Sequence, residues 1–198
     1  MKDSMFEQVY SAFWSSFKVL LLLTFVCGFC YPLAVTAISQ SLFPNQAAGS
    51  LTKDKTGNVT GSALIGQKFT TPKYFHSRPS ASDFATVPSG ASNLSPTSKA
   101  FATAVADRAQ SWGMPVESVP ADLLMASGSG LDPHISLQAA LFQVPAVSKA
   151  RGISKDVLMK LVEANELRPQ FIWDNNRLSL VNVLSLNAKL DSGAWAND

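Results

Sequence analysis

The chain has 198 residues, of which 46% are apolar and only 15% are charged, and its formal net charge is +2. Soluble domains usually carry about 25% charged residues, so the excess apolar residues must be concentrated in one region. The part after residue 43 has nearly equal numbers of basic and acidic residues and no basic run, which excludes a nucleic-acid-binding protein. Both cysteines, Cys27 and Cys30, lie in one uncharged stretch, which excludes a disulfide framework and a cysteine-ligated zinc site.

The apolar region is residues 19–38, a run of 20 residues without a charge. As a helix this run would be about 30 Å long, the thickness of the hydrocarbon core of a bilayer. We therefore predict a transmembrane anchor over residues 19–43, with a kink in its last turns at Pro32. A cleaved signal peptide is the alternative. The leading region of 18 residues, which contains acidic and several aromatic residues, argues against it.

The charges that flank the anchor predict its orientation. Lys2 and Lys18 precede the span, whereas the next cations, Lys53 and Lys55, follow it only after some 15 residues. Basic residues close to a span favour the cytoplasmic side. We expect residues 1–18 to be a cytoplasmic segment and the large domain to be extracytoplasmic.

Residues 44–198 have the composition of an ordinary soluble domain. They begin with an expected linker over residues 46–51 and with short paired strands over residues 59–69. A long loop, rich in serine and proline, is expected over residues 76–98. The last regular element is a strand-like run over residues 178–186, rich in valine and leucine.

Helices are predicted between the long loop and the last strand. A short buried element is expected at residues 123–125. Apolar residues then recur at helical spacing behind capping residues, and Gly152 is expected to end the second helix after a bend at Pro145. The N-caps are predicted at Thr97 or Ser98, at Ser136 and at Ser154. The predicted fold class is a single N-terminal transmembrane α-helix plus an α+β soluble domain.

Residues 54–57, Asp-Lys-Thr-Gly, match the centre of the phosphorylation motif of P-type ATPases. In that reaction a carboxylate attacks the γ-phosphate, and a nucleotide domain and Mg²⁺ ligands are required. This chain has room for neither. We therefore interpret residues 54–57 as a turn that joins two strands.

Two polar groups remain as candidates for chemistry. The loop Ser127-Gly128-Ser129-Gly130 could hold a phosphate through its backbone N–H groups, but it lacks the spacing and the lysine of a P-loop. His134 lies close in sequence to Asp132 and to the serines, which suggests a Ser/His hydrolase. The sequence around the serines has no nucleophile-elbow motif, so Asp132 is more simply read as part of a rigid turn.

Several separated segments together carry a family pattern. They are GSALIGQ (61–67), YFHSRPSA (74–81), SGASNL (89–94), VPADLLMASGSGLDPHIS (119–136) and VNVLSLNAKLD (181–191). With the N-terminal span before them, in this order, the chain resembles the C subunit (KdpC) of the bacterial Kdp potassium-transporting ATPase over nearly its whole length. It departs from the pattern at Ala146, where many relatives carry arginine.

The resemblance implies a single-pass subunit of the bacterial inner membrane with no catalytic site of its own. It implies assembly with a channel-like K⁺-translocating subunit and with a P-type ATPase subunit, in a complex that hydrolyses ATP to import K⁺. It also implies a catalytic chaperone that raises the affinity of the ATPase subunit for ATP. The residue that the resemblance connects with ATP is Gln143. The loop of Ser127, Gly128, Ser129 and Gly130 is added as a candidate because its own composition makes it the one loop suited to phosphate.

A domain outside the membrane cannot touch cytoplasmic ATP. In that orientation any effect on ATP affinity must be a coupling through the complex, and Gln143 is then a weak candidate for a nucleotide contact. Two other functions stay open at this point. One is a membrane-anchored domain that binds an extracytoplasmic ligand, and the other is the Ser/His hydrolase.

Overall fold

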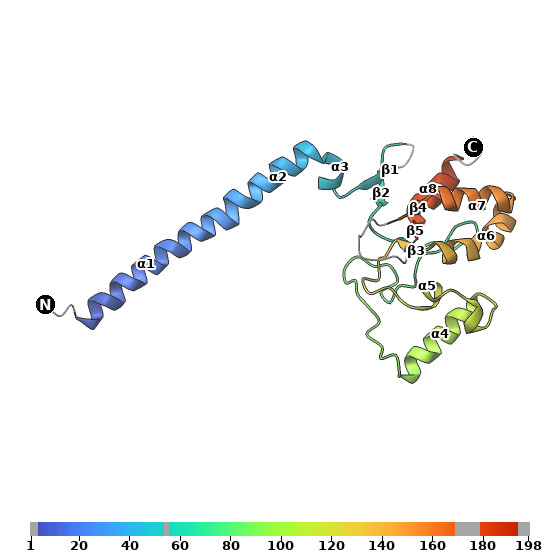
Figure 1. Cartoon of the computed structure of the whole chain (residues 1–198), viewed down its shortest axis with the longest axis horizontal. Helices are drawn as coiled ribbons and strands as arrows, with labels where there is room; N and C mark the ends of the chain where they lie inside the picture. Colours follow the sequence, from blue (N-terminus) through green and yellow to red (C-terminus); the bar gives the residue numbers. More distant parts are fainter. Residues whose placement is uncertain (1–3, 54–55, 169–178, 194–198) are drawn as a thin grey trace. The chain divides into compact units, whose positions relative to one another are not determined.

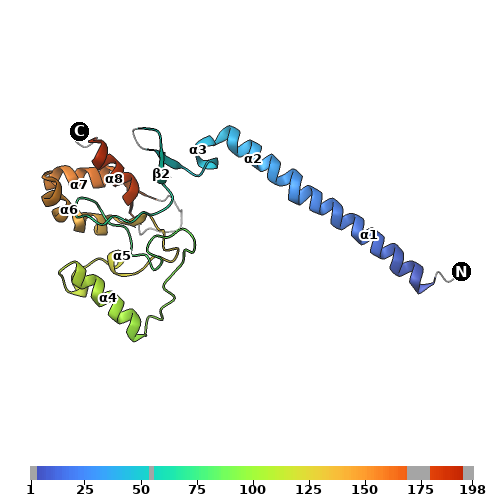
Figure 2. The same ribbon diagram turned by 180° about the vertical axis from the view of Figure 1, so that it is seen from behind.

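The computed structural model describes residues 4–53, 56–168 and 179–193. The chain forms two compact units, Met1–Leu51 and Thr52–Asp198. Figure 1 labels the elements of both units, and Figure 2 shows them from behind.

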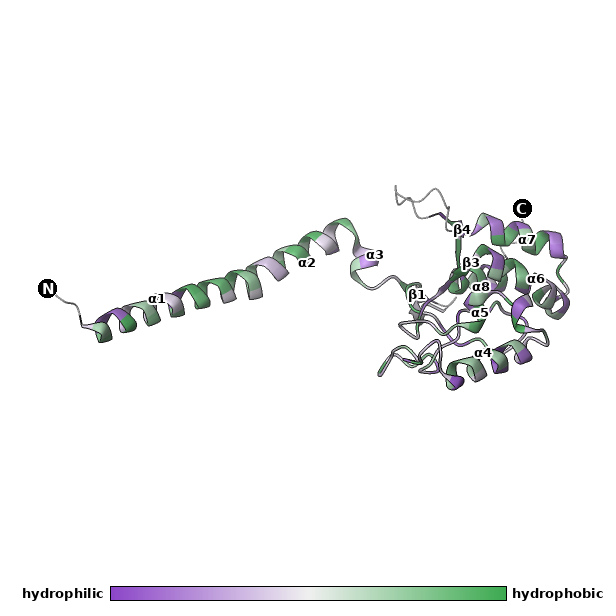
Figure 3. Cartoon of the chain, turned by 60° about the horizontal axis from the view of Figure 1, so that its bottom comes forward, coloured by the Kyte–Doolittle hydropathy of each residue, from purple (hydrophilic) through white to green (hydrophobic). Residues whose placement is uncertain are grey.

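The first unit is dominated by one helical rod from Met5 to Leu42, with 38 residues and a mean hydropathy of 2.2. Within the described residues it is the one helix that is long and apolar enough to cross a membrane. It consists of α1 (Met5–Phe25), the π-helical turn η1 (Val26–Cys30) and α2 (Tyr31–Leu42). Apolar residues cover most of its length in Figure 3. The predicted membrane helix is confirmed.

The rod is irregular close to Pro32, where a kink is predicted. A proline has no N–H, and its ring crowds the carbonyl four residues earlier, which here belongs to Gly28. The structure widens into the π-helical turn Val26–Cys30 directly before the proline. A π-helical turn of this kind is a known irregularity of helices beside a proline, and the kink in the last turns stays a prediction.

The start of the soluble part differs from the predicted linker and strand pairing. The short helix α3 (Pro44–Ala47) occupies part of the expected linker. Strand β1 (Leu51–Lys53) pairs with β2 (Val59–Ser62), so β2 finds its partner upstream and not within residues 59–69. The predicted turn between two strands is flanked as expected, although Asp54 and Lys55 themselves lie outside the described residues.

A three-stranded antiparallel sheet lies in the soluble unit, with strand order β3-β5-β4. Its strands are β3 (His134–Ser136), β5 (Leu180–Asn182) and β4 (Glu166–Leu167). In the register of the central pair, Ile135 lies opposite Val181. Both side chains are almost completely buried, so the sheet forms one wall of the core.

Helices of the soluble unit are α4 (Lys99–Ser111), the 3₁₀ turn η2 (Val116–Ser118), α5 (Ala121–Leu124), α6 (Leu137–Arg151), α7 (Lys155–Ala164) and α8 (Val183–Ser192). The predicted N-caps are confirmed, since the hydroxyls of Ser98, Ser136 and Ser154 each accept a bond from an N–H in the first turn. Gly152 ends α6 with φ 70°, as predicted. Figures 1 and 2 show α6, α7 and α8 grouped together, with α4 apart from them.

The predicted strand over residues 178–186 is wrong beyond Asn182. The chain turns into α8 because the side chain of Asn182 accepts a bond from the N–H of Ser185 and caps the helix. The buried residues that follow have helical spacing: Val183, Leu186, Asn187 and Leu190. Leu178 lies outside the described residues.

Candidate functional site

The centre of the soluble unit is an irregular segment, Tyr74 to Pro79, that two side-chain amides hold in place. Phe75 in this segment is completely buried, and no helix or strand is described between β2 and α4. Because such a segment makes no ladder of its own, its backbone groups need partners from elsewhere. We call residues 74–79 the clamped segment.

Gln143 on α6 binds one residue of the clamped segment through both ends of its amide. Its Oε1 accepts the N–H of His76 at 2.8 Å, and its Nε2 donates to the carbonyl of His76 at 3.0 Å. The same Nε2 also donates to the carbonyl of Ala139 at 3.2 Å. Gln143 is only 1% exposed. Both hydrogens of its amide nitrogen are therefore engaged inside the protein.

Asn187 on α8 holds the preceding residue in the same way. Its Oδ1 accepts the N–H of Phe75 at 2.9 Å, and its Nδ2 donates to the carbonyl of Phe75 at 2.9 Å. Asn187 is 2% exposed. Sequence reasoning missed this residue, because its partner lies more than a hundred positions away.

A third contact to the clamped segment comes from the predicted phosphate loop. The N–H of Ser127 donates to the carbonyl of Pro79 at 2.9 Å. Two of the sequence-predicted site features, Gln143 and the loop 127–130, thus bind the same segment, at His76 and at Pro79. No hydrogen bond is described between Gln143 and the loop 127–130.

The loop 127–130 uses several of its polar groups internally. The hydroxyl of Ser127 accepts the N–H of Gly130 at 3.0 Å, and the hydroxyl of Ser129 accepts the N–H of Leu131 at 3.1 Å. The two hydroxyls lie 3.2 Å apart. Since the N–H groups of Ser127, Gly130 and Leu131 already have acceptors, the loop would have to open to offer them to a phosphate.

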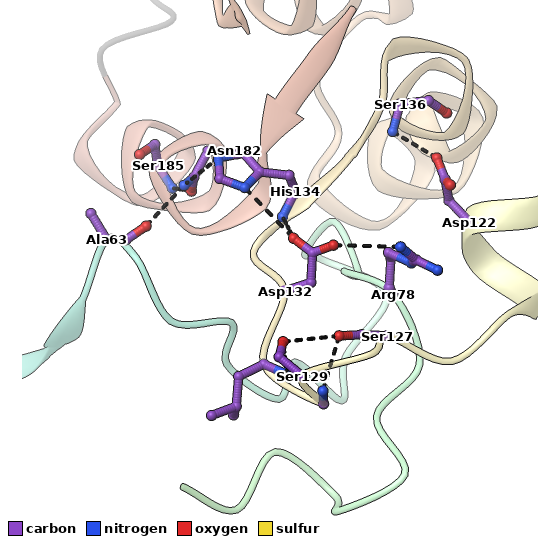
Figure 4. A network of polar contacts seen from close by, with 12 residues as sticks. Ala63, Arg78, Asp122, Ser127, Ser129, Asp132, His134, Ser136, Asn182 and Ser185 are labelled. Carbon is purple, nitrogen blue, oxygen red and sulfur yellow. Dashed lines mark hydrogen bonds and ion pairs between the residues drawn. The ribbon is translucent and has the colours of Figure 1, made fainter. Parts of the chain in front are cut away.

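Asp132 connects this turn to the clamped segment and to β3, as Figure 4 shows. One of its carboxylate oxygens lies 3.6 Å from Nη1 of Arg78. The other accepts the backbone N–H of His134 at 3.0 Å and lies 3.6 Å from the Nδ1 of that histidine. On its far side, Nε2 of His134 lies 3.5 Å from the amide of Asn182.

These contacts do not assemble a nucleophile and a base. The hydroxyls of Ser127 and Ser129 bond to each other and to backbone N–H groups, and neither bonds to His134. The residues that the structure describes also contain no group of three metal-ligating side chains. The arrangement is that of a turn held rigid by its own polar groups.

A pocket of about 450 Å³ lies beside the clamped segment. Cationic and aromatic side chains share its wall with Gln143 and with Ala146, and they are Lys68, Phe69, Tyr74, His76, Arg78, Phe84, Arg108 and Trp112. The rings of His76 and Trp112 meet edge to face, with centroids 6.0 Å apart. Burial lowers the pKa of His76, and the backbone carbonyls of Thr71 and Phe69 oppose this shift. The imidazole is therefore neutral at pH 7.

The family model described as "K+-transporting ATPase, c chain" matches residues 13–192 of this chain. A potassium-transporting ATPase KdpC subunit from Rhodopseudomonas palustris (strain BisB5) is 48% identical in an alignment that covers 88% of this chain and 93% of the relative. KdpC subunits from Pseudomonas putida (strain W619) and Geotalea uraniireducens (strain Rf4) are 48% and 47% identical, and cover 87% and 86% of this chain and 92% of each relative.

A match of this extent includes most of the membrane helix, the clamped segment, both clamping amides and the loop 127–130. The resemblance predicted from the sequence motifs is confirmed. The protein is a membrane subunit of a K⁺-transporting ATPase, and the chain belongs to the KdpC family.

Proposed function

We propose that this subunit is a non-catalytic part of the Kdp complex that assembles with the channel-like K⁺-translocating subunit and the P-type ATPase subunit. In this proposal it raises the affinity of the ATPase subunit for ATP by coupling through the complex, and it does not itself hold the nucleotide. The soluble domain is extracytoplasmic, and residues 1–18 are cytoplasmic.

The observation that carries the proposal is the environment of Gln143. Its amide is buried and bonds to both backbone groups of His76 and to its own helix. A side chain in this state acts by fixing the clamped segment. We therefore propose that Gln143 and the loop Ser127, Gly128, Ser129 and Gly130 are related to ATP only indirectly, as positioning residues that hold residues 74–79 for the partner subunits.

Equilibrium dialysis with labelled ATP tests this directly. The full chain alone, in detergent, should retain no ATP, whereas adding it to a complex that lacks it should lower the KM for ATP. The conservative variant Gln143→Asn, one methylene shorter, should raise the KM again without creating or removing ATP binding to the isolated chain. Saturable ATP binding to the isolated chain that Gln143→Asn weakens would refute the indirect role.

Orientation is tested separately, with a single cysteine. Ser192 at the end of α8 is exposed, so Ser192→Cys in a Cys27→Ser, Cys30→Ser background should react with a membrane-impermeant thiol reagent in intact spheroplasts. Labelling only after lysis would place the domain in the cytoplasm and make direct ATP contact possible.

A further inference from the structure

We propose that the pocket beside the clamped segment binds a small organic carboxylate with a flat apolar body. This ligand site goes beyond the role proposed for the subunit, and it follows from the size, charge and unsatisfied polar atoms of the pocket. Its volume of about 450 Å³ lies within the range of small-molecule sites, roughly 300–1,000 Å³.

The charges on the wall favour an anion. Three basic side chains line the pocket, Lys68, Arg78 and Arg108, whereas no acidic side chain is among its described lining residues. A cavity with one sign of charge and apolar walls attracts the opposite charge. The pocket therefore selects against cations and for anions.

Ion pairs around the pocket limit how much negative charge the ligand should bring. Lys68 bonds to Asp83 at 2.7 Å, and Arg78 lies 3.6 Å from Asp132. Arg108 donates to the carbonyl of Leu124 at 2.6 Å and has no ion pair among the described residues. One uncompensated positive charge matches a monoanion better than a polyphosphate.

Two residues of the wall each carry a buried polar atom without a hydrogen-bond partner among the residues that the structure describes. The Oγ of Ser77 and the Nε of Arg78 are buried and have no hydrogen bond, and both residues line the pocket. Buried donors without acceptors are costly and rare in native structures. A carboxylate oxygen can accept from a hydroxyl and from a guanidinium N–H, so such a ligand would satisfy both atoms once the Ser77 hydroxyl and the Arg78 guanidinium turn toward it.

The remaining wall favours a flat apolar body attached to the carboxylate. The rings of Phe69, Tyr74 and Trp112 all line the pocket. The ring of Trp112 meets that of Phe142 edge to face, with centroids 5.6 Å apart, which fixes the orientation of the indole. A rigid aromatic wall of this kind suits a planar ligand, because the wall loses little conformational entropy when the ligand binds.

Benzoate and benzamide are a matched pair of probes for the proposal, since they share a shape and differ in charge. Binding to the full chain in detergent is followed by the NMR signal of the Trp112 indole N–H, assigned with Trp112→Phe. Benzoate should shift this signal saturably with a Kd on the order of 1 mM, as expected for so small a ligand. Benzamide should bind at least about tenfold more weakly, a difference of about 1.4 kcal/mol.

Variants locate the site. Arg108→Gln should weaken benzoate at least about tenfold, whereas Arg168→Gln, which removes an exposed arginine away from the pocket, should not. Ala146 is an exposed residue of α6 that lines the pocket, so Ala146→Leu should weaken binding by taking up part of the space. Gln138→Leu places a leucine at an exposed position of α6 that does not line the pocket, and it should leave binding unchanged.

Each contrary result has a definite meaning. Equal binding of benzamide would show that charge does not select the ligand. Benzoate binding with the same affinity in Ala146→Leu would place the site elsewhere. If ATP displaced benzoate at concentrations below the Kd of benzoate, the pocket would prefer a polyanion. Each of these outcomes, or a lack of any saturable shift, overturns the proposal.

If Arg108→Gln fails to fold, the comparison of benzoate with benzamide and the Ala146→Leu variant still test the proposal. Displacement by ATP would also count against the indirect role proposed above for this subunit. The benzamide, Arg108→Gln and Ala146→Leu results do not bear on the KM for ATP of the complex, so failure of the ligand site and failure of the proposed function can be told apart.

Discussion

Gln143 and Asn187 lie on different helices and grip neighbouring residues of the same segment, His76 and Phe75, each by a pair of hydrogen bonds between 2.8 and 3.0 Å. Each amide offers one acceptor and one donor to one residue, as a neighbouring β-strand would. The two side chains thus replace a strand for a segment that has none, and they connect α6 and α8 through it.

Removing either clamping amide should destabilise the soluble domain. Gln143→Leu removes the partners of the part-buried N–H and C=O of His76, and Asn187→Leu removes those of the buried N–H and C=O of Phe75. The expected cost is about 1–3 kcal/mol for each unsatisfied group, and it should be larger for Asn187→Leu. Chemical denaturation of the full chain, followed by the far-UV signal of the soluble domain, measures the change. Gln138→Leu, at an exposed position of α6, is the control. Wild-type stability in both amide variants would mean that the clamped segment has other partners in solution.

Replacing either glycine of the loop 127–130 by alanine should change the stability of the domain to different extents. Gly130 has φ 72°, and a Cβ there would lie 2.8 Å from the carbonyl oxygen of Gly90. Gly130→Ala should therefore cost more than about 1 kcal/mol. Gly128 has no atom within 4 Å of an added Cβ and no left-handed φ, so Gly128→Ala should be nearly neutral. Equal thermal stability of the two variants would contradict a closed loop.

Asp132 is expected to stabilise its own turn. Asp132→Ala removes the acceptor for the N–H of His134 and the charge near Arg78, and should cost about 1–2 kcal/mol. Asp132→Asn retains an oxygen that can accept the N–H of His134, so it should lose less stability than Asp132→Ala. Melting temperature and copurification of the other subunits are measured together, and assembly should fall only in proportion to stability. A variant with normal melting that fails to assemble would instead place Asp132 against a partner.

His76 should make the domain less stable in mild acid. Burial lowers the pKa of His76 in the folded state below its value of 6.5, so the unfolded chain binds the proton more tightly. The unfolding free energy should therefore fall as pH drops below about 6.5, and this loss should stop below the folded-state pKa. Denaturation of the full chain at a series of pH values, compared with His76→Phe, isolates the contribution. A loss of stability on raising the pH through the same window would contradict the assignment.

Local signals explain which elements were predictable. The caps at Ser98, Ser136 and Ser154 and the stop at Gly152 involve neighbours within a few residues, and all are confirmed. The segment after Asn182 misled because its valines and leucines suit a strand as well as a helix. A helix is distinguished from a strand here only by the capping bond, in which the N–H of Ser185 donates to the side chain of Asn182, and by the burial of every third or fourth residue.

The site was less accessible to sequence reasoning, because its contacts are long-range. Gln143 was singled out through the family resemblance, yet nothing near it in the sequence indicates that His76 is its partner, 67 positions away. Asn187 and Phe75 are 112 positions apart. A buried amide can be suspected from one polar residue among the apolar positions of a helix, but which backbone it holds depends on the whole fold.

The π-helical turn Val26–Cys30 also changes which residues of the membrane rod share a side. A π turn accommodates about one more residue than an α turn, and one residue corresponds to about 100° of rotation. Side chains of α1 and α2 that seven-residue spacing would align are therefore rotated out of line across this turn. Any helix that packs along one side of α1 would meet a different side of α2. Deleting one residue from the turn would therefore rotate α2 by about 100° relative to α1.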